Sequence, residues 1–326
     1  MSEQKPKVVG VGNALVDILV SVDDAMLDKN GLEKGGMALV AEEEIQTLYD
    51  GVGPSTESSG GSVANTIAHL AMGGVPTAYV GKVAEDTFGR IFDHDLASLG
   101  VSTRLSKADN GDGTGRALVL ITPDGQRTMC TFLGAAVSLN GEDVTAGVPN
   151  ACDIVLIEGY LWDAPAGADI IAATVKRAEA AGAKIAVTLS DAGCVQRHLD
   201  DMRGFVESHC DILLANEAEA CALARETDLD GALDYVQRTV PLAVVTHSEK
   251  GSTVMQDDTR VSVAPHKVDN VVDTTGAGDA YAAGFLKAYL AGGGPTDWGN
   301  EGGRLAAQVI QHVGARRVSS RPAKAS

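Results

Sequence analysis

A glycine-rich segment in the last third of the chain carries the strongest chemical signal. Residues 273–280 read DTTGAGDA, and apolar residues at helical spacing follow them. A glycine turn that enters a helix leaves the first amides of the helix without partners, and the helix dipole adds to their positive potential. We therefore predict that the backbone amides of Gly276, Ala277 and Gly278 form a binding site for an anion such as a phosphoryl group.

Asp279 stands just inside this turn. A carboxylate beside a bound phosphate is repelled by it, so the presence of this residue favours a chemical role. Removal of the proton from a hydroxyl that attacks the phosphoryl group is such a role. Alternatively, Asp279 only stabilises the start of the helix, where aspartate is favourable in any protein. The segment by itself leaves both interpretations open.

A second motif lies near the start of the chain. Residues 60–65 read GGSVAN and precede a helical pattern, while Asp17 ends the segment GNALVD. Carboxylate and amide side chains offer acceptors and donors to neighbouring hydroxyl groups, and glycine lets a ring approach the backbone. Asp17, Gly61 and Asn65 are therefore candidate contacts of a hydroxylated small molecule. Alternatively, Asn65 forms only local hydrogen bonds at the start of its helix.

Together, these motifs resemble the two signatures of the ribokinase-like carbohydrate kinases, also called the phosphofructokinase-B family. They occur in the right order, about 210 positions apart, and the resemblance covers essentially the whole chain. It implies that Asp279 is the catalytic base and that the amides before it hold the transferring phosphoryl group, with Thr275 beside the nucleotide. The residues that it implies as acceptor contacts are Asn13, Asp17, Gly60, Gly61 and Asn65.

Residues 216–219, NEAE, follow an apolar strand pattern and resemble a metal-binding motif of the same family. In that motif the glutamate, here Glu219, organises water around Mg²⁺, and Asn216 assists it. The role is chemically reasonable because Mg²⁺ keeps several waters and needs only one or two carboxylates. An exposed helix face would also explain these residues.

The segment from Thr246 to Gly251 resembles the family's loop for the nucleotide phosphates. His247 departs from the pattern because glycine is common at its position, which puts the detailed nucleotide contacts in doubt. The cofactors that the resemblance implies are ATP and Mg²⁺, and the family also allows a monovalent cation such as K⁺.

Arg127 follows the turn Pro123-Asp124-Gly125, a strong signal for a reversal between two strands. It resembles an arginine that reaches the nucleotide phosphates in adenosine-kinase-type members when a small sheet closes. An arginine on such a lid neutralises charge that develops in the transition state. The alternative is a solvated charge on an edge strand.

The elements that position these residues predict an α/β fold. Residues 8–17 form a buried strand pattern with a tight turn, and residues 31–40 and 114–132 favour short antiparallel strands. After residue 151, strand patterns alternate with helical patterns, which is typical of a parallel sheet.

We therefore expect one ribokinase-like domain over residues 1–326, with a Rossmann-like, mostly parallel sheet flanked by helices. A small β-sheet lid is expected from roughly residues 14–58 and 112–134, where the antiparallel patterns lie. Residues 318–326 are expected to be loose.

Details of the sequence favour a nucleoside as the acceptor, above all adenosine, whose primary hydroxyl would be phosphorylated to give AMP. Residues 12–17, residues 133–136 and the insert at 27–58 resemble adenosine-kinase-type members. A purine needs an apolar slot, although core packing explains any one of the candidates better. These candidates are Leu15, Met37, Leu39, Phe132, Tyr160 and Trp162. The alternative is a sugar kinase that acts on ribose, fructose or 2-keto-3-deoxygluconate.

Two other classes of protein are alternatives to a kinase. Gly10 and Gly12 suggest a nicotinamide-binding dehydrogenase, but Leu15 occupies the place of the third glycine of that motif. A non-catalytic sugar or nucleoside sensor would keep the fold without turnover. It is disfavoured because a pure binding protein has no use for a base beside an anion site.

The composition limits the classes of molecule that the chain is expected to bind. The chain has 26 Lys and Arg against 44 Asp and Glu, a net charge of −18, which repels nucleic acid and anionic membranes. It has no apolar signal core at its start, no apolar run of the ~18 residues that cross a bilayer, and no ligand-like spacing of its five cysteines. We expect a cytoplasmic monomer or homodimer that binds small molecules, and neither nucleic acid nor a membrane.

Overall fold

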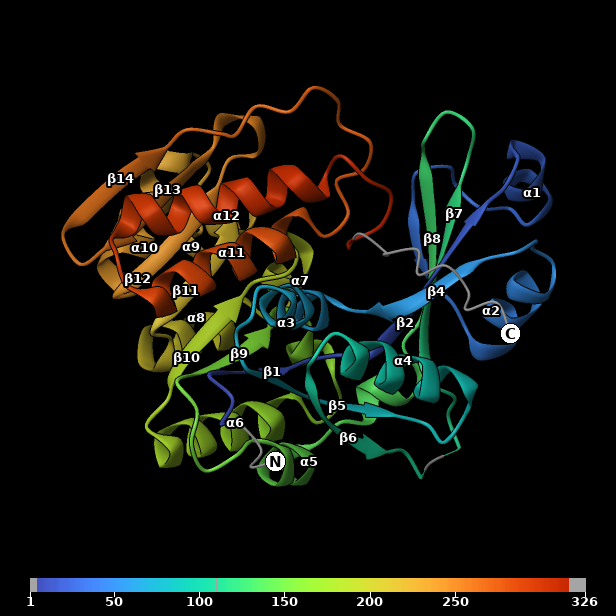
Figure 1. Cartoon of the computed structure of the whole chain (residues 1–326), viewed down its shortest axis with the longest axis horizontal. Helices are drawn as coiled ribbons and strands as arrows, with labels where there is room; N and C mark the ends of the chain where they lie inside the picture. The colour runs from blue at the N-terminus through green and yellow to red at the C-terminus, as the bar shows by residue number, and fades with distance from the viewer. Residues whose placement is uncertain (1–4, 110, 317–326) are drawn as a thin grey trace.

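The computed structural model describes residues 5–109 and 111–316, and contains two β-sheets with covering helices (Figure 1). The larger sheet has nine strands in the order β14-β13-β12-β11-β10-β9-β1-β5-β6. In chain order these are β1 (Val8–Val11), β5 (Thr77–Val83), β6 (Ser102–Lys107), β9 (Ile154–Glu158), β10 (Lys184–Thr188), β11 (Ile212–Asn216), β12 (Leu242–Thr246), β13 (Ser252–Gln256) and β14 (Thr259–Val263).

The smaller sheet has five strands in the order β3-β8-β7-β2-β4. They are β2 (Leu15–Ser21), β3 (Met37–Leu39), β4 (Thr56–Gly60), β7 (Gly115–Ile121) and β8 (Arg127–Phe132). The helices are α1 (Asp24–Lys29), α2 (Glu42–Asp50), α3 (Ser62–Met72), α4 (Thr87–Ser98), α5 (Gly141–Gly147), α6 (Gly167–Ala181), α7 (Ala192–Arg197), α8 (Leu199–His209), α9 (Glu217–Ala224), α10 (Leu229–Thr239), α11 (Ala277–Ala291) and α12 (Pro295–Val309), with short 3-10 turns at Gly134–Ser138, Gly159–Asp163 and Ser248–Lys250.

The larger sheet is the mostly parallel sheet that the sequence predicts. The strands from β12 to β6 are parallel to one another, and the two antiparallel pairs are β12 with β13 and β13 with β14. The predicted alternation of strands and helices after residue 151 is confirmed by β9 to β12 with α6 to α10 between them. Because the carboxyl ends of parallel strands meet at one edge, the segments that follow these strands come together there.

Two apolar layers cover the two faces of this sheet. Val8 of β1 packs in the layer of α3, α4, α11 and α12, whereas the next residue, Val9, packs in the layer of α5 to α10. Both valines are fully buried. A strand with two buried faces appears in the sequence as a continuous apolar run, which is why β1 and β9 were recognisable.

The smaller sheet is mixed, which corrects the prediction of short antiparallel strands. β7 and β8 form the predicted hairpin, and β2 pairs antiparallel with β4, but β3 pairs parallel with β8 and β2 pairs parallel with β7. The chain reaches β3 after α1 and an intervening loop, so β3 is not the hairpin partner of its neighbour.

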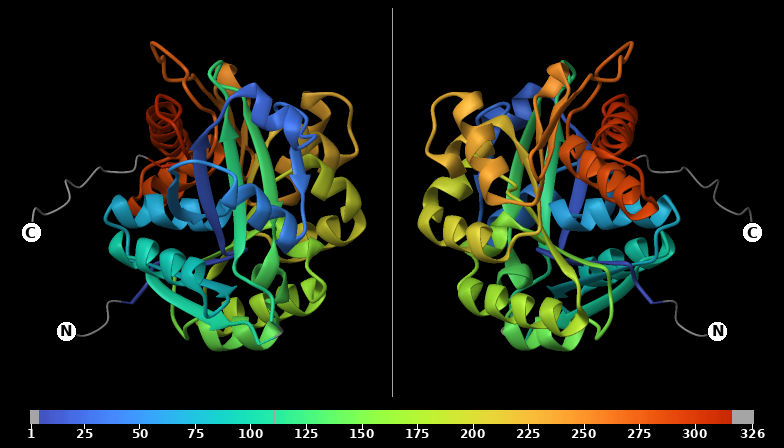
Figure 2. Two further views of the ribbon diagram at one scale, coloured as in Figure 1. Left: turned by 90° about the vertical axis from the view of Figure 1, so that its right-hand side faces the viewer. Right: turned by 90° about the vertical axis from the view of Figure 1, so that its left-hand side faces the viewer.

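The small sheet lies beside the larger one, at the right of Figure 1, with α1 and α2 on its outer side, and the side views of Figure 2 show the same arrangement. The chain passes from β1 to β2 through the short segment Gly12–Ala14. The expectation for residues 318–326 lies outside the described residues.

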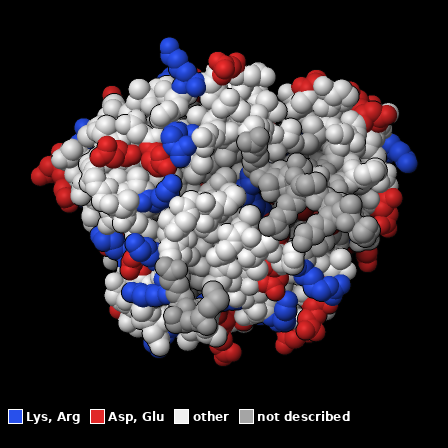
Figure 3. Space-filling view, in the orientation of Figure 1, with Lys and Arg blue, Asp and Glu red and all other residues white. Residues whose placement is uncertain are grey.

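Charged side chains of both signs lie around the face shown in Figure 3, and no continuous basic stripe is visible among the described residues there. Within the described ranges, no helix has both the length and the apolar character needed to cross a bilayer.

A glycine in α11 tests the close packing of α11 on α12. An ideal Cβ at Gly284 would lie 2.5 Å from the carbonyl oxygen of Glu301, whereas at the exposed Gly204 of α8 it would meet nothing within 4 Å. We expect Gly284→Ala to lower the free energy of unfolding by about 1–3 kcal/mol because the two helices must separate. We expect Gly204→Ala to be neutral or to stabilise by up to about 1 kcal/mol. Chemical denaturation measures both; equal effects of the two variants would contradict the packing argument.

Candidate active site

A pocket of about 260 Å³ lies where β10, β11 and β12 end and α11 begins. It brings together most of the predicted residues of the nucleotide side: Asn216, Glu219, Thr246, Gly276, Ala277, Gly278 and Asp279 line it, as do Ser62, Thr188 and Ser190. This is the edge of an open α/β sheet at which ligands bind.

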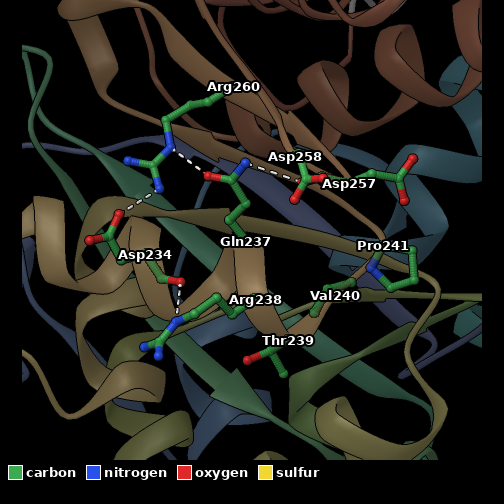
Figure 4. Close-up of a pocket in the computed structure, with 9 residues that line it drawn as sticks. All are labelled: Asp234, Gln237, Arg238, Thr239, Val240, Pro241, Asp257, Asp258 and Arg260. Atoms are coloured by element: carbon green, nitrogen blue, oxygen red, sulfur yellow. Dashed lines mark hydrogen bonds and ion pairs between the residues drawn. The ribbon is translucent and has the colours of Figure 1, made fainter.

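A larger hollow of about 1010 Å³ lies near the opposite ends of the strands, between α10 and the β13–β14 hairpin (Figure 4). Its polar groups already bond one another, as Arg260 does with Asp234 and Gln237. None of the predicted site residues lines it. We therefore assign the chemistry to the smaller pocket.

Asp279 is held by the first turn of α3. The Ser62 hydroxyl donates to its Oδ1 at 2.8 Å, and the Asn65 amide donates to its Oδ2 at 3.2 Å. Burial raises the pKa of Asp279 from 3.8 to about 6, while these two hydrogen bonds and the charge of Arg316 lower it. The carboxylate is therefore mostly ionised at neutral pH and still basic enough to accept a proton.

Asn65 thus does more than cap its helix, because its amide reaches Asp279 across the sequence. Its Oδ1 is buried and has no hydrogen-bond partner among the described residues, and the same holds for Oδ1 of Asn13. Unpaired buried acceptors are costly, so these two oxygens are suited to hydroxyl donors of a ligand. Ser62 was missed by the sequence analysis, although it stands inside the GGSVAN motif.

The turn before Asp279 differs in one detail from the predicted anion site. Gly276 takes a positive φ of 73° at the start of α11, and the Ala277 amide donates to the carbonyl oxygen of Thr274 at 3.1 Å. Of the three amides of this predicted anion site, those of Gly276 and Gly278 have no intramolecular partner among the described residues. Gly278 lines the pocket, and a Cβ there would meet nothing within 4 Å, so this residue borders open space.

Arg127 reaches this turn from the small sheet. Its guanidinium donates to Oγ1 of Thr275 at 2.8 Å and forms an ion pair with the buried carboxylate of Asp273. The alternative of an edge-strand charge does not hold, because β8 lies between β3 and β7 and the side chain is only 15% exposed. Two predicted residues far apart in the sequence, Arg127 and Thr275, are therefore in contact.

The acceptor side contains Asp17 of β2 and the glycines that follow β4. A Cβ at Gly60 would lie 2.2 Å from the carboxyl carbon of Asp17, and one at Gly61 would lie 2.4 Å from the carbonyl oxygen of Asn13. Gly61 also takes a φ of 96°, which a side chain disfavours. Both glycines are therefore required for the close approach of β2 and β4 at this point.

The charge of Asp279 acts on the carboxylate of Asp17. The pKa of Asp17 is raised to about 6, chiefly by burial and also by the charge of Asp279, although the charges of Arg316 and Arg127 lower it. Two carboxylates therefore face the same region from β2 and from α11.

Glu158 is a central residue that the sequence analysis missed. It is 1% exposed, and its two oxygens accept from the amides of Asn13 at 2.9 Å and Val63 at 3.0 Å. Its pKa is raised to about 7, chiefly by burial and also by the charge of Asp279, although the two amide hydrogen bonds lower it. Its only sequence signal is an acidic residue at the end of the apolar strand IVLIE.

Glu219 and Asn216 form a reciprocal cap at the start of α9. The side-chain amide of Asn216 donates to Oε1 of Glu219 at 2.6 Å, and the backbone amide of Glu219 donates to Oδ1 of Asn216 at 2.9 Å. Glu219 is 5% exposed, and its pKa is raised to about 7, chiefly by burial and also by the charges of Asp191 and Asp279, while the hydrogen bond from the backbone amide of Asn216 lowers it. A nearby cation would relieve this cost.

The donor set fits Mg²⁺ rather than a fully protein-bound metal. Among the described residues, no group of three or more His, Cys, Asp and Glu side chains is arranged to hold a metal ion. One carboxylate with water and phosphate oxygens is sufficient for Mg²⁺, and Glu219 lines the same pocket as the anion turn.

The loop from Thr246 to Gly251 is present, but only Thr246 lines the pocket. Gly251 takes a φ of 94°, and a Cβ there would lie 2.1 Å from the carbonyl oxygen of Val263, so this glycine shapes the loop. His247 takes a negative φ of −122°, and its Nε2 lies 2.9 Å from Oγ1 of Thr253. Glycine is therefore not required at position 247, and the contact of Gly251 with a nucleotide stays a prediction.

The six candidates for an apolar slot do not lie together in the structure. Leu15, Met37 and Leu39 lie on the same face of the small sheet as Asp17, because residues paired across strands share a face. Phe132 lies on the opposite face, where it and Phe88 stack on the guanidinium of Arg116, so its assignment to the slot was wrong.

Trp162 packs edge-on against Phe205 of α8 at 5.2 Å between ring centroids. This is the core packing that was the alternative for each aromatic candidate. Tyr160 is closer to the site, because the charges of Asp191, Glu158 and Glu219 all contribute to its raised pKa after burial.

Residues 21–322 match the model of the pfkB family carbohydrate kinases. The chain belongs to this family. It is therefore an ATP-dependent phosphotransferase that acts on a hydroxyl group, as predicted, and the dehydrogenase alternative does not hold.

Individual pfkB proteins are similar over nearly the whole chain. The solved structure of adenosine kinase from Sinorhizobium meliloti is 41% identical, with a TM-score of 0.86 and 97% of each chain covered. A probable sugar kinase from Rhizobium etli CFN 42 is 37% identical, with a TM-score of 0.85 and coverage of 98% of this chain and 97% of that one. Adenosine kinase of Schizophyllum commune is 29% identical over 338 residues, 94% of this chain and 96% of that protein.

The raised pKa values predict how stability depends on pH. Between pH 4 and pH 7 the folded protein holds protons on Asp279 that the unfolded chain has lost, so the free energy of unfolding falls as pH rises through this window. We expect Asp279→Asn to be about 1–2 kcal/mol more stable than the wild type at pH 7.5 and equal to it at pH 4. Urea unfolding at both pH values measures this, with the exposed Asp258→Asn as control. A variant that is no more stable at pH 7.5 would contradict the burial argument.

Proposed function

We propose that this kinase transfers the γ-phosphoryl group of ATP to the primary hydroxyl of adenosine, giving AMP. The observation that carries the choice of acceptor is the face of the small sheet that bears Asp17. Leu15, Met37 and Leu39 share this face, and Met37 and Leu39 are 59% and 66% exposed. Large exposed apolar side chains on a ligand-facing surface are suited to a flat aromatic base.

Asp17 is suited to the ribose of such an acceptor. Its carboxylate accepts hydrogen bonds from vicinal hydroxyl groups, and the buried Oδ1 atoms of Asn13 and Asn65 offer further acceptors beside it. Gly60 and Gly61 keep the backbone close to Asp17 and let the ring approach. In this arrangement, the acceptor lies between the small sheet and the start of α3.

Asp279 takes the proton of the primary hydroxyl as that oxygen attacks the phosphoryl group. Ser62 and Asn65 orient the carboxylate, and its pKa of about 6 keeps it ionised at neutral pH. The amides of Gly276 and Gly278 and the guanidinium of Arg127 stabilise the negative charge that develops on the phosphoryl oxygens.

Glu219, positioned by Asn216, would hold Mg²⁺ through water, and Thr246, Thr275 and Gly251 would lie along the nucleotide. When bound, Mg²⁺ neutralises phosphate charge and orients the transferred group. The family resemblance also allowed a monovalent cation, but Arg127 already neutralises the buried carboxylate of Asp273 at the anion turn. The proposal therefore uses ATP and Mg²⁺ alone.

The small sheet, from roughly residues 14–58 and 112–134, acts in this proposal as a lid of a single domain that spans residues 1–326. Closure excludes water, the competing nucleophile. We further propose a cytoplasmic enzyme that works as a monomer or homodimer.

A sugar is the second candidate acceptor. Asp17, Asn13 and Asn65 would bind the hydroxyls of a sugar equally well, and the similarity to the probable sugar kinase of Rhizobium etli favours this alternative. The apolar face distinguishes the two, because a sugar has no base to cover it.

Replacement of the base tests the mechanism. We expect Asp279→Asn to lower kcat about 10²–10⁴-fold because general base catalysis is lost, with the Kd values of adenosine and ATP nearly unchanged. ADP release with adenosine measures turnover, and calorimetry measures binding. Asp258→Asn, an exposed carboxylate, should behave like the wild type. Unchanged turnover in Asp279→Asn would overturn the assignment of the base.

Truncation of the apolar face tests the choice of acceptor. We expect Met37→Ala with Leu39→Ala to raise KM for adenosine about tenfold, since roughly 1.4 kcal/mol of apolar contact is lost. Any activity with ribose should change less than twofold. Leu199→Ala, on the other side of the larger sheet, serves as the control. Equal losses with both acceptors would contradict the slot.

A further inference from the structure

The last described residues of the chain pack directly against the active site. The amides of Val272 and Asp273 donate to the carbonyl oxygen of Ile310 at 2.8 and 3.1 Å. The Gly314 amide donates to Oδ2 of Asp273 at 2.6 Å. Residues 310–316 are thus hydrogen-bonded to residues 272–273, which lead into the anion turn.

Ala315 lies against both the anion turn and α3. A Cβ at Gly276 would lie 2.5 Å from the Cβ of Ala315, so the two backbones are in close contact. The carbonyl oxygen of Ala315 lies 3.0 Å from Nε2 of the buried His69 on α3. These contacts fix the direction in which the next residue, Arg316, enters the site.

Arg316 crosses to the base of the small sheet. Its guanidinium donates to the carbonyl oxygen of Ser59, to the Ser59 hydroxyl at 2.9 Å and to Oδ2 of Asp95 at 3.2 Å. Ser59 is the residue before Gly60 and Gly61, and Asp95 in turn accepts from the Ser59 amide at 2.8 Å. The arginine side chain is 8% exposed, and buried arginines are rare unless they are paired.

Besides its pairing with Asp95, Arg316 acts electrostatically on two carboxylates of the site. Its positive charge acts on Asp17 more strongly than that of Arg127 does, and it also acts on Asp279. The charged and polar groups that face these two carboxylates are Glu158 on β9, Glu219 on α9, Arg127 on β8, Arg316, and the donors Ser62 and Asn65 on α3. Two of these groups are cations, and only Arg316 acts on both Asp17 and Asp279.

We propose that Arg316 is a positioning residue of the kinase reaction, which anchors the Ser59–Gly61 turn and brings a positive charge to the side of the site that holds Asp17 and Asp279. The proposal rests on the proposed function in one respect, the role of Asp279 as base. It assigns to the C-terminal segment a part in catalysis that the two signature motifs do not contain.

The sign of the effect follows from charge. The Arg316 guanidinium favours the ionised form of Asp279, so its removal raises the pKa of Asp279 above about 6. The base is then protonated over a wider acid range, and kcat/KM falls there while it recovers at higher pH. A purely structural role of Arg316 would instead lower activity equally at every pH.

The test compares four variants by the pH dependence of kcat/KM for the acceptor. Arg316→Gln removes the charge and keeps an amide that donates to Ser59, whereas Arg316→Lys keeps the charge. Asp95→Asn weakens the anchor and leaves the arginine in place. Arg304→Gln makes the same charge change at the surface, where Arg304 pairs with Glu301 and is 41% exposed.

We expect the acid limb of Arg316→Gln to move up by about one pH unit, the lower end of what a neighbouring opposite charge produces. At the acid end this is a roughly tenfold loss of kcat/KM. Arg316→Lys, Asp95→Asn and Arg304→Gln should not show an upward shift. Thermal unfolding is measured for each variant, and Arg316→Met is a second neutral replacement if the glutamine variant is unstable.

An unshifted acid limb in Arg316→Gln, with turnover still abolished in Asp279→Asn, would overturn this inference and leave the proposed function standing. The same shift in Arg316→Lys as in Arg316→Gln would also overturn it. Failure of both neutral variants to fold would give Arg316 a structural role alone and overturn it as well. Full turnover in Asp279→Asn would instead refute the mechanism on which the inference rests.

Discussion

Two partly buried carboxylates, Asp17 on β2 and Asp279 on α11, lie close enough for the charge of Asp279 to act on Asp17, and the rest of the site compensates for their repulsion. Charge that is removed from water and placed near like charge is costly unless donors and cations surround it. Ser62 and Asn65 donate to Asp279, and Arg127 and Arg316 supply positive charge. This arrangement lets Asp279 be unprotonated near neutral pH, as a base must be. It also keeps Asp17 ionised, so that its carboxylate can bind the hydroxyl groups of the acceptor.

The donors and cations that offset the repulsion between Asp17 and Asp279 come from segments that are far apart in the sequence. The fold is therefore needed to bring them together. The small sheet contributes Asp17 and Arg127, the first turn of α3 contributes Ser62 and Asn65, and the C-terminal segment contributes Arg316. The ion pair of Arg127 with Asp273 joins the small sheet to the anion turn. Movement of the small sheet would therefore change the charge around the reacting groups as well as their access to water.

Much of this could be predicted from the sequence, because some signals are local. Buried parallel strands appear as apolar runs, and the glycine turn of residues 273–280 enters a helix at once. Glu158 could not be predicted, since its partners, the amides of Asn13 and Val63, are set by tertiary contacts. Phe132 was misplaced because the face of a strand depends on its register, which aromatic character does not reveal.

The central claim is that this pocket transfers a phosphoryl group to a nucleoside. The most direct measurement is ADP release by the purified protein with ATP and Mg²⁺, compared across adenosine, inosine, guanosine, ribose, fructose and 2-keto-3-deoxygluconate. Our account predicts a kcat/KM for adenosine well above that for every sugar, with AMP as the phosphorylated product. A sugar that exceeds all three nucleosides would contradict it.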